Sequence, residues 1–214
     1  MADTKNQFRA KGYKIARIAI FPGAFDPIHQ GHLEFARAAI KNCHLDKVYF
    51  LPEPRPRHKQ GVKALEHRIE MAQRAVAQEP EMGVIALHQA RSNTLDTLPQ
   101  IIARFGNAQL FLLSGERILR HLPYWLPIDS ELRLSRAIIG VHSATTETLQ
   151  AQFDLFKQTS GLKLGFVRFE APKLTARSLS IRRALRQGQI PDIIPASVAR
   201  YIKAQRLYAP VSTE

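Results

Sequence analysis

The stretch at residues 15–39 constrains the fold of this chain more than any other. It begins with a short apolar run at residues 15–21 and passes through a Pro-Gly turn. It continues into residues 33–40, where apolar side chains recur at helical spacing. The sequence therefore predicts a strand, a tight loop and a helix in immediate succession, with His29 and His32 at the junction of loop and helix.

This junction is suited to binding an anion. Free backbone N–H groups and the positive end of the helix dipole attract a phosphate, and Gly31 lets it approach the backbone closely. Imidazoles there can donate hydrogen bonds to a phosphoryl group whose charge changes during a reaction. An ordinary turn and helix-start role is the alternative for His29 and His32. The surrounding letters GAFDPIHQGH, between a strand and a helix, favour phosphate chemistry.

The length of 214 residues suits one well-buried core. We expect a single domain at residues 15–214, preceded by a disordered basic segment at residues 1–14. No apolar run is long enough to span a bilayer, and the first fourteen residues lack the apolar stretch of a secretory signal. We therefore expect a cytoplasmic location and no membrane partner.

The formal net charge of +13 favours anionic partners. The basic residues are scattered along the chain, without an arginine-rich tail or the aromatic interleaving typical of single-strand binders. Small anionic substrates are therefore favoured over nucleic acid. Cys43 is the only cysteine, which excludes an internal disulfide and suggests simple packing.

Predicted strands and helices alternate along the chain. After the first strand and helix, apolar runs predict strands at residues 47–51, 83–87, 109–113, 136–141 and 164–169. Amphipathic spacing and capping residues predict helices at residues 64–78, 92–105, 147–157, 178–187 and 195–205. This order predicts an α/β fold: a doubly wound, Rossmann-like parallel sheet with helices on both faces and a C-terminal helical pair.

A proline-rich loop follows the strand at residues 47–51. Three prolines in five residues forbid regular structure, and the loop ends in the basic residues Arg57, His58 and Lys59. Open α/β sheets bind ligands at such strand ends. A solvated charged loop fits the sequence equally well.

With these elements in order, the chain resembles the nicotinate-mononucleotide adenylyltransferase family, within the HIGH-motif nucleotidylyltransferase superfamily. The resemblance extends from about residue 18 to residue 208. It is carried by GAFDPIHQGH at 23–32, the proline-rich loop ending in His58 and Lys59, SNTLDTL at 92–98, Ser114-Gly115 followed by Trp125, and the closing segment at 193–208.

The resemblance implies a nucleotidylyltransferase domain and a specific reaction. The 5′-phosphate of nicotinate mononucleotide attacks the α-phosphate of ATP, which releases pyrophosphate and leaves nicotinate adenine dinucleotide. Mg²⁺ is implied only as the ion that arrives bound to ATP, and no metal site of the protein itself is implied. His29 and His32 would contact the transferred and leaving phosphates. Arg182 would hold the β- and γ-phosphates together with Ser178.

The same resemblance assigns two sets of binding residues. Those expected to bind ATP are Gly23, Ala24, Phe25, Gly31, Gly115, Glu116 and Ser178. Those expected to bind the mononucleotide are His58, Lys59, Asn93, Thr94 and Trp125. Trp125 would stack on the pyridine ring, although a core position also suits the only tryptophan. Asn93 and Thr94 would receive the nicotinate carboxylate through their backbone N–H groups, and helix capping is compatible with that role.

The sequence departs from the family pattern at several positions. Pro22 and Ala24 replace residues that could offer phosphate donors, Arg117 stands where an aspartate is usual, and Leu179 replaces a threonine. Asn93 stands where a tyrosine is usual. Another acceptor or nucleotide donor, or a non-catalytic nucleotide- or RNA-binding role, is therefore the alternative. The oligomeric state, a homo-oligomer included, is left open by the sequence.

Overall fold

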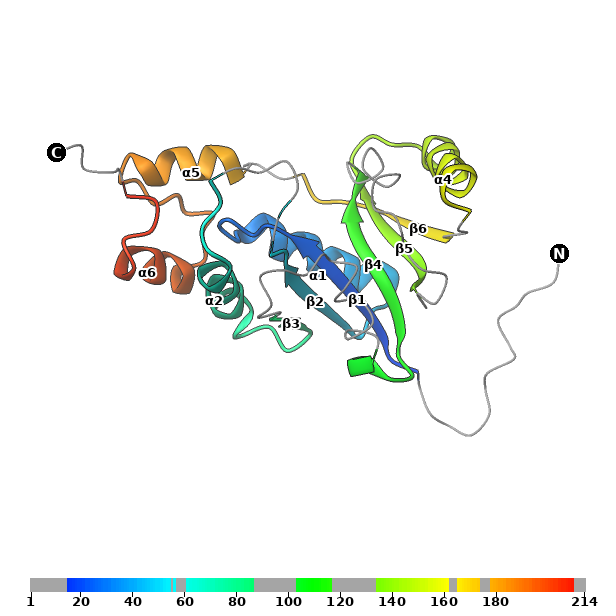
Figure 1. The fold of residues 1–214 in the computed structure, drawn as a ribbon, viewed down its shortest axis with the longest axis horizontal. Helices are drawn as coiled ribbons and strands as arrows, with labels where there is room; N and C mark the ends of the chain where they lie inside the picture. The colour runs from blue at the N-terminus through cyan, green and yellow to red at the C-terminus, as the bar shows by residue number, and fades with distance from the viewer. Residues whose placement is uncertain are drawn as a thin grey trace.

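A parallel sheet forms the centre of the molecule in the computed structural model (Figure 1). The structure describes residues 15–54, 56, 61–86, 103–116, 134–161, 165–173 and 178–209. Six strands pair in the order β3-β2-β1-β4-β5-β6, and all pairings are parallel. The strands are β1 (Arg17–Gly23), β2 (Lys47–Pro52), β3 (Met82–Val84), β4 (Gln109–Gly115), β5 (Leu134–Val141) and β6 (Gly165–Glu170).

Helices cover both faces of this sheet. They are α1 (Gln30–Cys43), α2 (Leu65–Val76), α4 (Thr146–Ser160), α5 (Ser178–Arg186) and α6 (Ala196–Ala204). Successive side chains of a strand point to opposite faces. On β5, Ile138 packs in the cluster that includes α1, whereas Ala137 and Ile139 pack in the cluster of α4. The predicted doubly wound sheet with helices on both faces is therefore confirmed.

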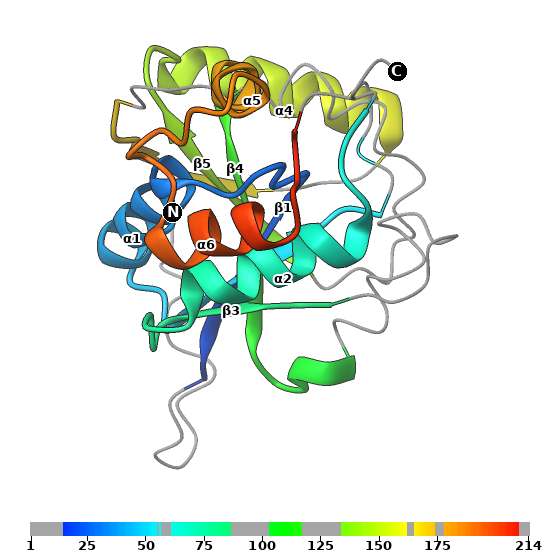
Figure 2. The ribbon, with the colours of Figure 1, turned by 90° about the vertical axis from the view of Figure 1, so that its left-hand side faces the viewer.

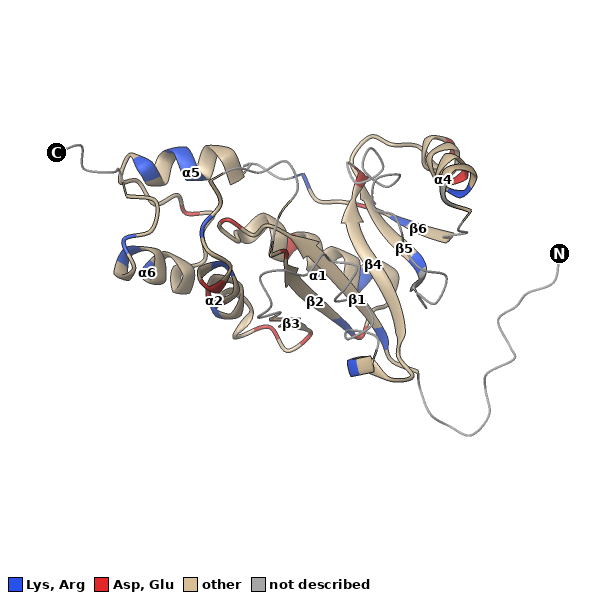
Figure 3. Cartoon of the chain, viewed as in Figure 1, with Lys and Arg blue, Asp and Glu red and all other residues tan. Residues whose placement is uncertain are grey.

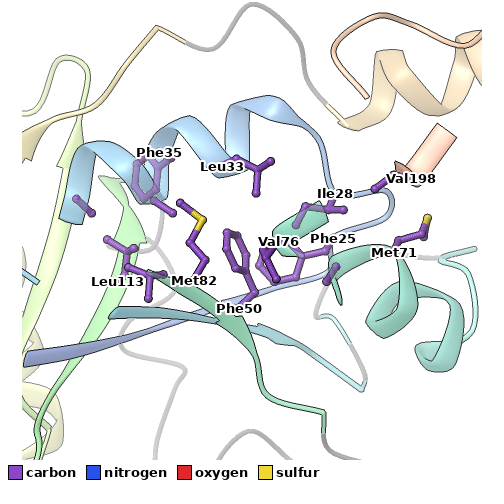
Figure 4. Close-up of a cluster of buried hydrophobic side chains, with 14 of the residues drawn as sticks. Phe25, Ile28, Leu33, Phe35, Phe50, Met71, Val76, Met82, Leu113 and Val198 are labelled. Carbon is purple, nitrogen blue, oxygen red and sulfur yellow. The ribbon is translucent and has the colours of Figure 1, made fainter. Parts of the chain in front are cut away.

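The larger core lies between the sheet and helices α1, α2, α5 and α6. Figure 4 shows Phe50 from β2 among Leu33 and Phe35 from α1, with Met71 from α2 and Val198 from α6 nearby. Cys43 is buried in the same cluster, which confirms its predicted packing role. Burial raises the pKa of its thiol, while nearby Arg17 acts in the opposite direction.

The core on the opposite face is built by α4 and β5. Leu149, Phe153 and Phe156 of the helix are buried against the strand. The ring of Phe153 stacks on Phe166 of β6 with 4.8 Å between ring centroids. The side chain of Thr145 accepts a hydrogen bond from the Thr148 backbone at the helix start.

Two glycines allow other elements to approach closely. A Cβ added to Gly140 of β5 would lie 2.3 Å from the ring of Phe35 on α1. The close approach of α1 to β5 therefore requires a glycine at this position. A Cβ added to Gly83 of β3 would lie 2.7 Å from the ring of Tyr49. The strand predicted at residues 83–87 was placed too late, because the strand is Met82–Val84, a short edge strand paired with β2.

The C-terminal helices lie at one end of the molecule. Helix α6 lies beside α2 in both views (Figures 1 and 2). In Figure 1, α5 lies at the same end of the molecule and α4 lies at the opposite end. The predicted C-terminal helical pair is confirmed. Most of the helix predicted at residues 92–105 lies outside the described residues. Its last three residues, 103–105, are described and are helical. In the described chain, no helix has the length and apolar character needed to cross a membrane.

Candidate active site

The loop of residues 24–28 lies at the carboxyl end of the central strand β1. Strand β2 pairs on one side of β1 and β4 on the other, so the order of the strands reverses here. Open α/β sheets bind their ligands outside the carboxyl ends of the strands at such a switch point. The predicted phosphate loop is therefore placed where this architecture forms a ligand site.

Aromatic packing fixes the start of this loop. Phe25 is buried with a φ of 48°, and its ring makes edge contacts with Phe21, His32 and Phe50. A Cβ added to Gly23 would lie 2.9 Å from the Phe25 ring. Gly23 and Phe25, predicted to bind ATP, therefore have a packing role that sets the path of the backbone, and their contact with ATP stays a prediction.

His29 is the residue before α1 and is almost wholly buried, with 2% of its surface exposed. This burial lowers the pKa of its imidazole from 6.5 to about 4, so the ring is neutral at physiological pH. Nε2 lies 3.3 Å from the Ser178 hydroxyl, while Nδ1 has no hydrogen-bond partner among the described residues. A neutral imidazole in this position can still donate one hydrogen bond to a phosphate oxygen.

His32, in the first turn of α1, is partly exposed beside His29. The two rings stack with 3.8 Å between centroids, and the backbone N–H of His29 donates to His32 Nδ1 at 3.2 Å. In the neutral ring the proton is then on Nε2. Gly31 lies buried between the two histidines in the same turn. The structure therefore brings the predicted pair together at a helix N-terminus.

Helix α5 brings two more predicted residues to this loop. Ser178, its first residue, contacts the His29 ring, and Arg182 Nη1 donates to the backbone carbonyl of Asp26 at 2.9 Å. The N-termini of α1 and α5 thus converge on His29. Two helix N-termini with imidazole and guanidinium donors are chemically suited to binding a polyphosphate.

Glu116, just after β4, is held by the loop that follows β5. Its Oε2 accepts hydrogen bonds from the backbone N–H groups of His142, Ser143 and Ala144 at 3.0–3.2 Å. Burial raises the pKa of Glu116, but these hydrogen bonds outweigh burial and the net shift is downward. The carboxylate therefore joins the ends of β4 and β5, and its expected role in ATP binding, like that of Gly115, stays a prediction.

Several predicted residues cannot be placed in this site. His58, Lys59, Asn93, Thr94 and Trp125 lie outside the described residues. The residues predicted for the acceptor side are therefore not located, whereas those predicted for the polyphosphate side lie close together, and their binding role stays a prediction.

Two buried side chains at the loop were missed by sequence reasoning. Arg68 of α2 donates to the carbonyl of Ala24 at 2.9 Å, and the Tyr208 hydroxyl donates to Asp26 Oδ1. A signal for Arg68 was available: it lies three residues after Leu65 and four before Ala72, on the apolar face of its helix. Nothing in the sequence pattern indicated that Tyr208 would reach the loop.

Comparison with known proteins agrees with this geometry. A family model described as cytidylyltransferase-like matches residues 20–190. A nicotinate-nucleotide adenylyltransferase of Bacillus subtilis is 30% identical over 90% of this chain and 98% of its own length. A probable nicotinate-nucleotide adenylyltransferase of Geobacillus kaustophilus is 30% identical over 91% of this chain and 87% of its own. The chain belongs to the nicotinate-nucleotide adenylyltransferase family.

Solved structures agree on the fold of this adenylyltransferase family member. A nicotinic acid mononucleotide adenylyltransferase of Plasmodium falciparum, solved with NaAD, superposes with a TM-score of 0.68. It is 17% identical, and the match covers 90% of this chain and 97% of the other. At this identity the likeness concerns the fold, and it supports the Rossmann-like architecture.

Proposed function

We propose that this protein transfers AMP from ATP to nicotinate mononucleotide, giving nicotinate adenine dinucleotide and pyrophosphate. The observation that carries the proposal is the convergence of His29, His32, Ser178 and Arg182 at the carboxyl end of β1. Membership of the nicotinate-nucleotide adenylyltransferase family supplies the substrates. A cytoplasmic location, expected from the sequence, remains a prediction that cell fractionation would test.

The reaction exchanges one phosphoanhydride linkage for another. A 5′-phosphate oxygen of nicotinate mononucleotide forms a bond to the α-phosphorus of ATP. The bond from that phosphorus to the α,β-bridging oxygen breaks, and pyrophosphate leaves with its electron pair. No covalent enzyme intermediate is required, so the protein acts by positioning the phosphates in line and stabilising their charge.

The two histidines act as hydrogen-bond donors in this proposal. His29 is neutral because it is buried, and His32 presents Nε2 from a more exposed ring. Donors fixed in place before the reaction stabilise charge that appears on the leaving phosphates. Ser178 and Arg182 extend the donor set toward the β- and γ-phosphates.

Mg²⁺ enters this proposal as part of the ATP substrate. It shares the charge of the polyphosphate and is carried by the nucleotide. Among the described residues, no group of three histidine, cysteine, aspartate or glutamate side chains could hold a metal ion. The acceptor side is assigned by resemblance alone: Trp125 would stack on the pyridine ring, Asn93 and Thr94 would meet the carboxylate, and His58 and Lys59 would add charge.

Pyrophosphate release by the purified protein tests the proposal. The protein is given ATP, Mg²⁺ and nicotinate mononucleotide, and His32→Ala is assayed in parallel to exclude a contaminating enzyme. Release that requires both substrates supports the proposal. No release from wild-type protein given nicotinate mononucleotide would refute it, and release with nicotinamide mononucleotide alone would indicate another acceptor.

A different nucleotide donor is the second candidate, and one observation favours testing it. Leu179, where a threonine is expected, is 69% exposed next to Ser178 on α5, so the polyphosphate side offers an apolar side chain in place of a hydroxyl. Lys and Arg occur on helices at both ends of the molecule and are not gathered on one element (Figure 3). The same assay with other nucleoside triphosphates separates the donors, while steeply salt-dependent RNA binding without turnover would indicate a binding protein.

A further inference from the structure

A buried polar cluster lies directly behind the histidine loop. Asp26 and Arg68 are each 1% exposed, and Tyr208 is 3% exposed. The Tyr208 hydroxyl donates to Asp26 Oδ1, and the charge of Asp26 acts on the Arg68 guanidinium. Burying polar groups is unfavourable unless their partners are well placed. Oδ2 of Asp26 has no hydrogen-bond partner among the described residues, so the carboxylate depends on the Tyr208 hydroxyl and on the charge of Arg68.

Arg68 ties together the backbone of three segments. Its guanidinium donates to the carbonyls of Lys63 at 2.8 Å, Ala24 at 2.9 Å and Pro54 at 3.4 Å. These carbonyls belong to the start of α2, the loop after β1 and the loop after β2. Burial lowers the pKa of Arg68, and the Asp26 carboxylate opposes that effect. Asp26 therefore compensates the charge of Arg68, whose guanidinium holds the loops after β1 and β2.

Tyr208 reaches this cluster from the end of the described chain, beyond α6. One face of its ring is covered by Lys63, whose Nζ lies 5.2 Å from the ring centroid. Burial and the neighbouring Asp26 carboxylate raise the pKa of Tyr208 far above its usual value. The hydroxyl therefore keeps its proton at neutral pH and donates to Asp26.

Other residues of the C-terminal segment form hydrogen bonds with backbone groups of the loop and of the first residue of α1. Arg182 donates to the Asp26 carbonyl at 2.9 Å, and the Gln30 N–H at the start of α1 donates to the Ile193 carbonyl at 2.8 Å. The loop that ends in His29 is thus held by side chains and backbone groups that lie more than 150 residues later in the sequence.

We infer that Tyr208 is a positioning residue: its hydroxyl, acting through the Asp26 carboxylate, sets the loop of residues 24–28 and so the placement of His29 and His32. Neither Tyr208 nor Asp26 touches substrate in this inference. The C-terminal helices then contribute to catalysis in two ways, by carrying Ser178 and Arg182 and by fixing the opposite histidines. The inference rests on the proposed adenylyl transfer.

Deleting one hydroxyl tests this role, and the chain offers a matched control. Tyr208→Phe removes the donor to Asp26 and leaves the ring in place. Tyr201→Phe removes a hydroxyl of the same region that lies 2.9 Å from His67 Nδ1 on α2, away from the loop. Both variants should lower the unfolding temperature by a few degrees, because each loses one hydrogen bond.

The kinetic readout separates positioning from stability. For Tyr208→Phe we expect kcat to fall about tenfold with the KM of each substrate within about twofold of wild type, because misplaced catalytic donors weaken the transition state more than binding. For Tyr201→Phe we expect wild-type kcat. Equal kcat values in wild type and Tyr208→Phe, or equal losses in the two variants, would overturn the inference.

Imidazole NMR of the substrate-free protein provides a readout that does not depend on the reaction. The groups that contact the His29 ring are the His32 ring on α1 and the Ser178 hydroxyl on α5. Arg182 donates to the carbonyl of Asp26, three residues before His29. If the loop loosens in Tyr208→Phe, water reaches His29 and its pKa rises from about 4 toward 6.5. Tyr201→Phe should leave the His29 titration unchanged.

Asp26→Asn provides a second variant that keeps the shape of the side chain. It removes the charge facing Arg68, so we expect the same rise in the pKa of His29 and a comparable loss of kcat. If wild-type protein shows no turnover, the proposed reaction fails while the NMR comparison still tests the positioning role. If turnover is normal and the His29 titration is identical in wild type, Tyr208→Phe and Asp26→Asn, the positioning role fails alone.

Discussion

Replacing His29 with glutamine should make the stability of the protein less sensitive to acid. His29 is neutral in the folded protein because burial lowers its pKa to about 4, whereas in the unfolded chain an exposed imidazole titrates near 6.5. Between these values the unfolded chain binds a proton that the folded protein does not bind. The contribution of His29 to stability is therefore complete above pH 6.5 and declines as the pH falls.

The size of this effect follows from the two pKa values. Linkage between protonation and folding gives a loss of about 2 kcal/mol by pH 5 and about 3 kcal/mol by pH 4, relative to pH 7.5. Glutamine has no titrating group, and its amide reaches about as far as the imidazole Nε2 that faces Ser178. The variant is expected to be less stable than wild type at pH 7.5 and to lose that disadvantage as the pH falls.

Urea unfolding at pH 7.5, 6 and 5 measures this difference. The free energy of unfolding is obtained for wild type and His29→Gln at each pH, so that all other titrating groups cancel in the comparison. His142→Gln, which removes an exposed imidazole after β5, is the matched control and should follow wild type. A wild-type minus His29→Gln difference that is constant from pH 7.5 to pH 5 would show that His29 is not held neutral by burial.

Three further substitutions probe separate parts of the fold and the site. His32→Ala should lower kcat at least about 100-fold in the pyrophosphate assay, and an unchanged kcat would remove the residue from the mechanism. Arg17→Leu removes hydrogen bonds to two carbonyls at the end of α1. The free energy of unfolding in urea should fall by about 2 kcal/mol, and an unchanged value would contradict this capping role. Gly140→Ala should cost about 1–3 kcal/mol through its clash with Phe35. Gly115→Ala should not, because no atom of the described residues lies within 4 Å of the added Cβ, and equal losses would contradict this.

Most of the fold could be predicted because its buried strands are short apolar runs and its helices are amphipathic. The strand predicted at residues 47–51 is Lys47–Pro52, and the helix predicted at residues 64–78 is Leu65–Val76. The edge strand β3 was predicted less well. It has three residues, and the fit of Tyr49 over Gly83, which no local pattern reveals, helps to set its position.

The histidine loop could be predicted from the sequence, but its support could not. A run such as GAFDPIHQGH between a strand and a helix is a local signal. The place of Arg68 on the apolar face of its helix suggests burial, but the sequence does not show which groups the guanidinium would contact. Its burial depends on the carbonyls of Ala24 and Pro54, which the fold brings to it from two other segments. Contacts of this kind are visible only once the strand ends are placed side by side.

Glu116 shows a second limit of sequence reasoning. Its position next to Gly115 suggested a carboxylate available to a nucleotide. Its role in ATP binding stays a prediction, but the carboxylate also meets three backbone N–H groups of the segment after β5. The closeness of that segment to Glu116 cannot be derived from spacing in the sequence. A backbone turn that presents several N–H groups in one direction attracts any nearby carboxylate.

In the proposed reaction, the departures at Pro22 and Ala24 would shift phosphate binding toward the helices. The paired residues of β1 and β4 end at Ile20, so Pro22 lies beyond that ladder and its missing N–H leaves the β4 pairing intact. Ala24 is buried and its carbonyl is held by Arg68, so this part of the loop serves the protein interior. Donors to a polyphosphate must then come from the N-termini of α1 and α5 and from Arg182. Because α5 is held to the loop partly through the Arg182–Asp26 contact, ATP binding and the order of the C-terminal helices should be coupled.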